Sequence, residues 1–379
     1  MRGFHSPARI YFSPELMWRG TADRLAQGVI DVLISGKFIT LFSFLFGLGF
    51  AVQLERAELG GARLLPVYCR RLGVLLLIGL AHAFLVWWGD ILLPYALLGF
   101  LLLLFRRRSQ KTVMIWAWIG LWFPVLLVGL FVVLSSLGVR IMPDLVPTRE
   151  VLERTVATYA KGGFSQILAQ RAGEVAFNFT GTLFFSPKIL GMFLLGFYVW
   201  RRGLIQRFPR NLPLLHKAMF WGLLIGLAGN LAGVLITVIW RVDPIKPSLL
   251  GLVVAVVMTV GVPALSCFYA SAIGLLFQQP AWQKRLAPFA AVGRTALSNY
   301  LLQSVVCTMI FYSYGFGLYG RVGPAAGLIP TVLLYPAQLV LSVAWLRRYP
   351  FGPMEWLWRT LTYGRAQSMR VARGDAAQA

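Results

Sequence analysis

Residues 80–104 read LAHAFLVWWGDILLPYALLGFLLLL, and the pattern of this stretch recurs along the whole chain. Two apolar runs, each long enough to enter a lipid bilayer, meet at the polar corner Trp87-Trp88-Gly89-Asp90. The first run also contains His82. Titratable groups are costly inside a bilayer, so His82 and Asp90 are the first candidates for a functional site.

The composition places the chain among membrane proteins. Hydrophobic residues make up 58% of the 379 residues, charged residues make up 13%, and the mean hydropathy is +0.71. A water-soluble surface needs more polar groups than this. Apolar runs near the length of a helical span favour helices over the short alternating strands of a membrane barrel. We therefore predict an all-α, polytopic transmembrane bundle whose main partner is the lipid bilayer.

About nine apolar segments are predicted to span the membrane within one integral domain, residues 37–346. They are Lys37–Leu54, Leu72–Trp88, Ile91–Phe105, Thr112–Leu137, Leu183–Trp200, Ala218–Trp240, Leu249–Phe277, Ala296–Phe316 and Ala325–Leu346. The seventh segment contains Gly261 and Pro263, so we expect it to be kinked, tilted or broken near its middle.

Basic residues sort the loops into two sets. If the spans alternate in direction, one set of loops carries most of the 36 Lys and Arg residues, including Arg106–Arg108 and the arginines after Leu346. Cytoplasmic loops are enriched in Lys and Arg, so this set, with the C-terminus, is predicted to be cytoplasmic. The net charge of +23 is then explained by the basic residues of the cytoplasmic loops, and no nucleic-acid partner is expected.

Four segments outside the spans complete the predicted organisation. Residues 1–36 are a polar external segment with an interfacial amphipathic piece, and its lack of a preceding span leads us to expect that a first span is missing or replaced. Residues 138–182 form an external loop with two separate helix-like stretches, either a solvated cap or a lid. Residues 347–365 are predicted to be a cytoplasmic interfacial helix, and residues 366–379 a disordered tail.

Glycines within the predicted spans favour close helix packing, with a transport hinge as the alternative. They are Gly47, Gly49, Gly191, Gly196, Gly222, Gly226, Gly229 and Gly233. The three cysteines are unpatterned, and no phosphate-binding loop, dinucleotide fingerprint or zinc signature occurs in a usable context. We therefore predict no cofactor and no metal site.

His82 lies ten residues into its predicted span, which places it near the middle of the membrane. A neutral imidazole there would act as a general base or a proton relay, or would only bind a neighbouring helix. Asp90 directly precedes a predicted helix and is expected mainly to cap it, although it would also orient His82. We expect the helix face that carries Asn299 and Gln303 to be the nearer partner of His82.

The stretch GRTALSNYLLQSVVCT, residues 293–308, is the second concentration of polar groups. Asn299 and Gln303 share one helix face, and Tyr300 and Ser304 lie on the adjacent row. Such a stripe forms interhelical hydrogen bonds or recognises a polar headgroup or carbonyl. At the predicted starts of spans stand three further cations, which are membrane anchors or anion-binding groups: Lys37, Lys188 and Arg294.

Five ordered blocks over about residues 30–365 resemble the YeiB-type bacterial inner-membrane proteins, a family called domain of unknown function 418. The blocks are KFITLFSFLFGLGFAVQLERAE, RRLGVLLLIGLAHAFLVWWGDILLPYALLGFLLLLFRRRS, KILGMFLLGFYVWRRG, VGRTALSNYLLQS and FGPMEWLWRTLTYG. The resemblance implies a bacterial inner-membrane location. The family is also similar to membrane acyltransferases that use a buried histidine, which implies by analogy that His82 is the base.

Two functions follow as expectations. In the first, a transmembrane acyltransferase modifies an envelope glycan, a lipid or a small acceptor, with His82 as base and the Asn299/Gln303 face holding the acyl donor or stabilising the oxyanion. In the second, a transporter or flippase moves a small or lipid-linked solute. A non-catalytic scaffold is the third possibility. A cavity shared by His82 and the Asn299/Gln303 face would favour the enzyme, and a sealed His82 would argue against it.

Overall fold

A computed structural model of the chain describes residues 3–8, 10, 17–61, 64–139, 147–206, 212–243 and 246–369. Within these residues all regular elements are helices, so the predicted all-α class is confirmed. The elements are α1 (Thr21–Leu33), α2 (Lys37–Leu59), α3 (Leu64–Leu85), α4 (Leu92–Leu102) with the 3-10 turn η3 (Leu103–Phe105), α5 (Gln110–Ser136), α6 (Arg149–Lys161), α7 (Phe164–Arg201), α8 (Leu212–Ile239), α9 (Leu249–Leu276), α10 (Pro280–Arg294), α11 (Ala296–Phe311), α12 (Leu328–Leu346) and α13 (Pro353–Tyr363).

Each of the nine predicted spans corresponds to a helix or part of one. By length and composition, seven helical stretches in the described part of the chain would cross a membrane, and the first of these joins α1 to α2. The apolar stretches Leu92–Phe105 and Ala296–Phe311 are shorter. The membrane character is therefore clear, whereas a count of nine spans is not confirmed.

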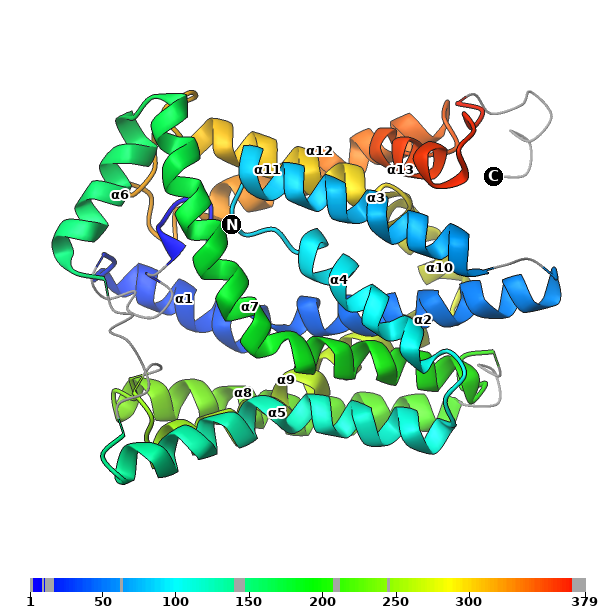
Figure 1. The fold of residues 1–379 in the computed structure, drawn as a ribbon, viewed down its shortest axis with the longest axis horizontal. Helices are drawn as coiled ribbons and strands as arrows, with labels where there is room; N and C mark the ends of the chain where they lie inside the picture. Colours follow the sequence, from blue (N-terminus) through cyan, green and yellow to red (C-terminus); the bar gives the residue numbers. More distant parts are fainter. Residues whose placement is uncertain are drawn as a thin grey trace.

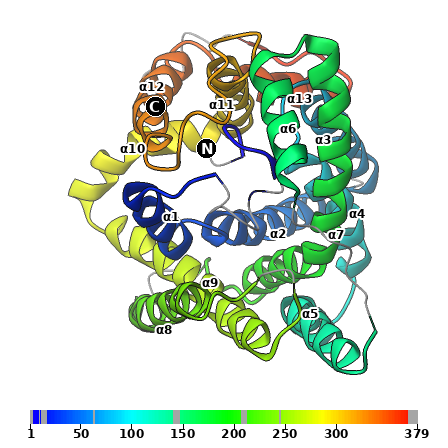
Figure 2. The same ribbon diagram turned by 90° about the vertical axis from the view of Figure 1, so that its left-hand side faces the viewer.

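The long helices run side by side and α2 packs against both α7 and α9 (Figure 1). Helices α8 and α9 form the most extensive pair, followed by α5 with α7, while α3 packs on α4 and α13 (Figures 1 and 2). Helix α6 lies at one end of the bundle and α13 at the other (Figure 1). This separation matches the predicted sorting of the loops into two sets.

Glycines make the closest helix contacts possible. A Cβ atom on Gly47 of α2 would overlap the backbone carbonyl of Phe193 in α7. One on Gly229 of α8 would lie 3.0 Å from the Cα of Gly261 in α9. The predicted packing seams are therefore confirmed at these helix pairs, but Gly49 faces open space and its assignment to a seam was wrong.

Helices α7 and α10 differ from the sequence-based boundaries, whereas α9 has almost the predicted ones. Helix α7 is continuous over 38 residues, so the second half of the predicted loop 138–182 is an extension of a span. The polar residues before Leu183 are accommodated within the helix, and Thr180 Oγ1 satisfies its hydroxyl by donating to the carbonyl of Ala176 at 3.0 Å. Helix α9 continues past Pro263, and α10 was not predicted.

The described residues 3–8 do not form a solvated segment. Phe4, His5, Ser6 and Ala8 are all buried. The aromatic ring of Phe4 stacks on Trp87 with ring centroids 3.9 Å apart, and the indole Nε1 of Trp87 donates to the carbonyl of Gly3 at 2.9 Å. These residues therefore form part of the core next to the α3–α4 corner.

Candidate functional site

The candidate site is built at the corner between α3 and α4. Helix α3 begins at Leu64, earlier than predicted, and His82 lies in its last turn. At 1.5 Å per residue, His82 is roughly 27 Å from the start of the helix, near its end instead of at its middle. The predicted place of His82 in the middle of a helix was therefore wrong, while its depth in the membrane stays a prediction.

His82 and Asp90 form a buried pair. The imidazole Nδ1 lies 2.7 Å from Asp90 Oδ1, and the two side chains are only 1% and 2% exposed. The other carboxylate oxygen, Oδ2, accepts the backbone N–H of Leu93 at 2.6 Å. Asp90 therefore caps α4, as predicted, and also orients His82. The pair fits because Gly79 has no side chain where α3 approaches Leu93.

Tyr300 of α11 completes this group. Its ring centroid lies 5.0 Å from that of His82, and its hydroxyl donates to Asp90 Oδ1 at 3.4 Å. The Tyr300 hydroxyl oxygen in turn accepts the backbone N–H of Ile91 at 3.3 Å. The helix row that meets His82 is thus the Tyr300 row.

Asn299 is engaged elsewhere, which corrects the expected partnership with His82. The Asn299 amide nitrogen donates to Thr295 Oγ1 and to Ser342 Oγ, each at 2.9 Å, so both of its N–H groups bind within the α11–α12 contact. Gln303 is half-buried and forms no hydrogen bond with the residues that the structure describes. Ser304 donates back to the Tyr300 carbonyl at 3.1 Å.

The second imidazole nitrogen of His82 is available for chemistry. If Nδ1 carries the proton shared with the carboxylate, Nε2 presents a lone pair. In the described part of the chain Nε2 is buried without a hydrogen-bond partner. Trp87 lies edge-on to the imidazole, with ring centroids 6.3 Å apart, and Phe4 stacks on the far side of Trp87. We call Phe4 and Trp87 the aromatic cover.

A buried polar group on α7 adjoins the corner, and the sequence analysis missed its role. Arg171 is fully buried and its Nη1 donates to the carbonyl of Phe84 at 3.0 Å, in the last turn of α3. Its Nε and Nη2 meet no hydrogen-bond partner among the described residues. The signal was present in the spacing, because Arg171, Glu174 and Asn178 repeat on one helix face. Asn178 donates to the Trp88 carbonyl at 3.3 Å.

Glu174 and Tyr159 form the outer part of this group. The Tyr159 hydroxyl donates to Glu174 Oε2 at 2.7 Å. Burial, with Glu174 as the next cause, raises the pKa of Tyr159 far above its usual range, so the phenol stays protonated at neutral pH. Helices α6 and α7 are thereby tied together over the corner. This part of the predicted external loop is packed structure.

The three predicted anchor cations lie apart from His82. Lys37 begins α2 as predicted, is buried, and donates through Nζ to the carbonyl of Asp31 at 2.6 Å. Lys188 lies inside α7 and not at a helix start. Arg294 ends α10 and donates to the carbonyl of Pro350 at 3.2 Å. An anion-binding role for each of them stays a prediction.

Glu355 of α13 is a structural carboxylate that the sequence analysis did not single out. Its Oε1 accepts the backbone N–H groups of Leu297 at 2.6 Å and Ser298 at 3.1 Å, at the start of α11. The indole Nε1 of Trp358 donates to the Arg71 carbonyl at 2.9 Å, so α13 also binds α3. The predicted interfacial helix is thus docked on the two helices that carry the candidate site.

Comparison with known proteins identifies the family. The family described as "Protein of unknown function (DUF418)" matches residues 199–365. The uncharacterized protein YxaH of Bacillus subtilis (strain 168) is 38% identical over 90% of this chain and 83% of its own length. The uncharacterized protein YeiB of Escherichia coli (strain K12) is 29% identical over 95% of this chain and 90% of its own length. No solved structure shows significant similarity. This chain is therefore a helical membrane protein that belongs to the YeiB-type DUF418 family.

Proposed function

We propose that the protein is a membrane acyltransferase-like enzyme of the bacterial inner membrane, in which His82 is the general base. The observation that supports this most directly is the buried His82–Asp90 pair with Nε2 left without a partner. A carboxylate on Nδ1 fixes the ring and stabilises the imidazolium that forms when Nε2 takes a proton. The proposed acceptor is the hydroxyl of an envelope glycan, a lipid or a small molecule.

The proposed step is a direct acyl transfer. Nε2 removes the proton of the acceptor hydroxyl while the hydroxyl oxygen attacks the carbonyl carbon of an activated acyl donor. The bond from that carbon to the donor's leaving atom breaks, and the imidazolium returns the proton to the leaving group. Asp90 keeps its hydrogen bond to Nδ1 throughout, and Tyr300 positions the carboxylate. Asn299 is not assigned to the oxyanion, because both of its N–H groups are already used.

Access to His82 requires movement. The imidazole is almost fully buried, and Trp87 of the aromatic cover lies edge-on to it, which argues against activity in this closed arrangement. The proposal therefore includes an opening of Phe4 and Trp87. Phe4 belongs to the short segment 3–8, which is joined to Trp87 by a stacked ring pair and one backbone hydrogen bond.

The test compares acyl groups on envelope glycans and lipids in a deletion strain with those in strains carrying plasmid-borne variants. We expect a modification that disappears on deletion and returns with the wild-type gene but not with His82→Ala. His216→Ala is the matched control, since His216 is exposed on α8, and it should restore the modification. Full restoration of the modification by a normally expressed His82→Ala variant would exclude His82 as the general base.

The alternative of a transporter or flippase gives a different result in the same strains. The unmodified solute would accumulate on one side of the membrane, and no covalent acyl product would be lost. Purified protein in vesicles would then move the solute without any acyl donor. This outcome would replace the enzyme proposal.

A further inference from the structure

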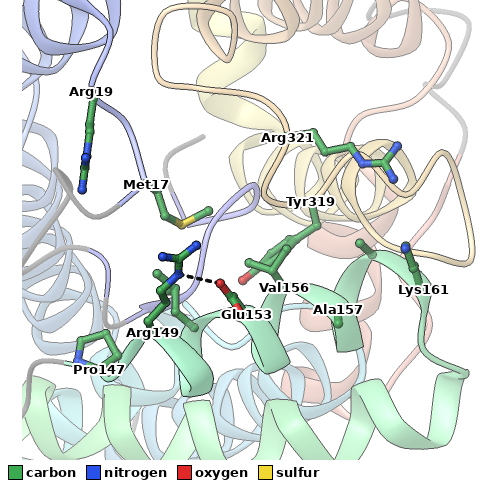
Figure 3. A pocket seen from close by; sticks show the side chains of 12 residues that line it. Met17, Arg19, Pro147, Arg149, Glu153, Val156, Ala157, Lys161, Tyr319 and Arg321 are labelled. Atoms are coloured by element: carbon green, nitrogen blue, oxygen red, sulfur yellow. Dashed lines mark hydrogen bonds and ion pairs between the residues drawn. The ribbon is translucent and has the colours of Figure 1, made fainter.

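A cavity lies away from His82, at the end of the bundle that carries α6. It has a volume of about 680 Å³ and is lined by α6, by Met17 and Arg19 near the start of α1, and by Tyr319 and Arg321 after α11 (Figure 3). This volume is within the range of small-molecule sites in proteins. Nothing in the proposed acyl transfer uses it.

The described lining of this cavity is strongly cationic. Arg19, Arg149, Lys161 and Arg321 line it, and Glu153 is the single acid among the described lining residues. Arg149 Nε binds Glu153 Oε1 at 2.8 Å, as Figure 3 shows, so this acid is already neutralised. Lys161 and Arg321 add two further positive charges, for which the described lining holds no other acid. Grouped like charges in a concave site raise the local concentration of anions.

Lys161 and Arg321 are the cations that a ligand would use most directly. Both side chains are exposed, and neither side chain forms a hydrogen bond or ion pair with the part of the chain that the structure describes. They come from different elements, the last turn of α6 and the loop after α11, and both border the cavity. An ammonium and a guanidinium held on two sides of one cavity suit a phosphate or a carboxylate.

The wall of the cavity is apolar. Val156, Ala157 and Ala160 present one side of α6, and the Tyr319 ring stands opposite. Tyr319 packs on Tyr159 with ring centroids 4.7 Å apart, within a buried aromatic cluster, so the wall is held in place. A small inorganic anion would leave this surface unused, whereas an anion with an apolar tail would cover it.

We propose that this cavity binds an anionic amphiphile, with its phosphate or carboxylate between Lys161 and Arg321 and its apolar part against Val156 and Ala157 of α6. The assignment does not depend on His82 or on acyl transfer. The cations and the apolar wall of the cavity contribute separately to the affinity for this ligand, and separate experiments measure the two contributions.

The experiment uses the full chain in phosphatidylcholine nanodiscs, with empty nanodiscs as the blank. Titration calorimetry compares three probes: decyl phosphate, inorganic phosphate and decyl glucoside. We expect decyl phosphate to bind with an affinity that falls with added salt, and the other two to bind at least tenfold more weakly. Equal binding of inorganic phosphate would overturn the amphiphile, and equal binding of decyl glucoside would overturn the anion site.

Variants localise the binding. The double variant Lys161→Gln with Arg321→Gln should bind decyl phosphate about tenfold more weakly, since each exposed ion pair contributes modestly. Arg154→Gln is the control, because it removes an exposed cation from the same helix outside the cavity, and it should bind as the wild type does. Ala157→Phe should block binding by filling the cavity at an exposed position. Unchanged binding in both the charge variant and Ala157→Phe would refute the site.

Discussion

The strongest quantitative prediction concerns the coupling between His82 and Asp90. Their hydrogen bond is 2.7 Å long and almost fully buried, so removing either partner leaves a polar group without water. A buried hydrogen bond that involves a charged group contributes about 1.5–3 kcal/mol. A double-mutant cycle of His82→Ala and Asp90→Ala should therefore give a coupling free energy of about 2 kcal/mol.

The two functions of Asp90 separate in the same experiment. Oδ2 caps α4 through the Leu93 amide, and loss of such a cap costs about 0.5–2 kcal/mol. Asp90→Ala should lose the cap and the histidine bond together, roughly 3 kcal/mol in total. Asp90→Ser retains a capping hydroxyl and should recover about 1 kcal/mol of this loss, because its short side chain still reaches the nearby amide.

The assay is reversible unfolding of the purified protein in mixed detergent micelles, which yields a free energy of unfolding for each variant. The control cycle pairs Asp90→Ala with His216→Ala, and it should be additive, because His216 is exposed on another helix and bonds its own helix at Leu212. A His82–Asp90 coupling below about 0.5 kcal/mol would show that the pair does not act as a unit. The proposed orientation of Nε2 would then lose its basis.

Three further predictions follow from the packing and the topology. Gly47→Ala should lower the free energy of unfolding by about 1–3 kcal/mol because its methyl group overlaps α7, whereas Gly49→Ala, in open space, should raise it by up to about 1 kcal/mol; the reverse order would contradict the α2–α7 seam. Glu355→Ala should speed hydrogen exchange at the first amides of α11, and Glu355→Gln should do so less, because the amide oxygen still accepts; unchanged exchange would reject the cap. In a cysteine-free background, Lys161→Cys should react with an impermeant maleimide in intact cells and Arg365→Cys only after permeabilisation, and the opposite pattern would reverse the predicted orientation.

Much of the fold can be predicted from local sequence patterns. Long apolar runs predicted the helices, and small residues at helical spacing predicted a close-packing face on α8, because both effects depend on neighbours within one helix. Breaks were harder to place. The polar stretch within α7 resembled a loop, but its polar side chains can be satisfied within the helix, as the Thr180 hydroxyl is by the Ala176 carbonyl.

The sequence by itself determined that this is a helical membrane protein and singled out His82, Asp90 and the polar row on α11. Composition and periodicity are sufficient for that, since burying a titratable group in an apolar run is costly wherever the run packs. The tertiary structure decided the partners: Tyr300 in place of Asn299, a carboxylate that both caps α4 and holds the imidazole, and Arg171 from a helix 87 residues away along the chain. Partner choice depends on how distant helices rotate and on which glycines let them approach, and no local pattern encodes that geometry.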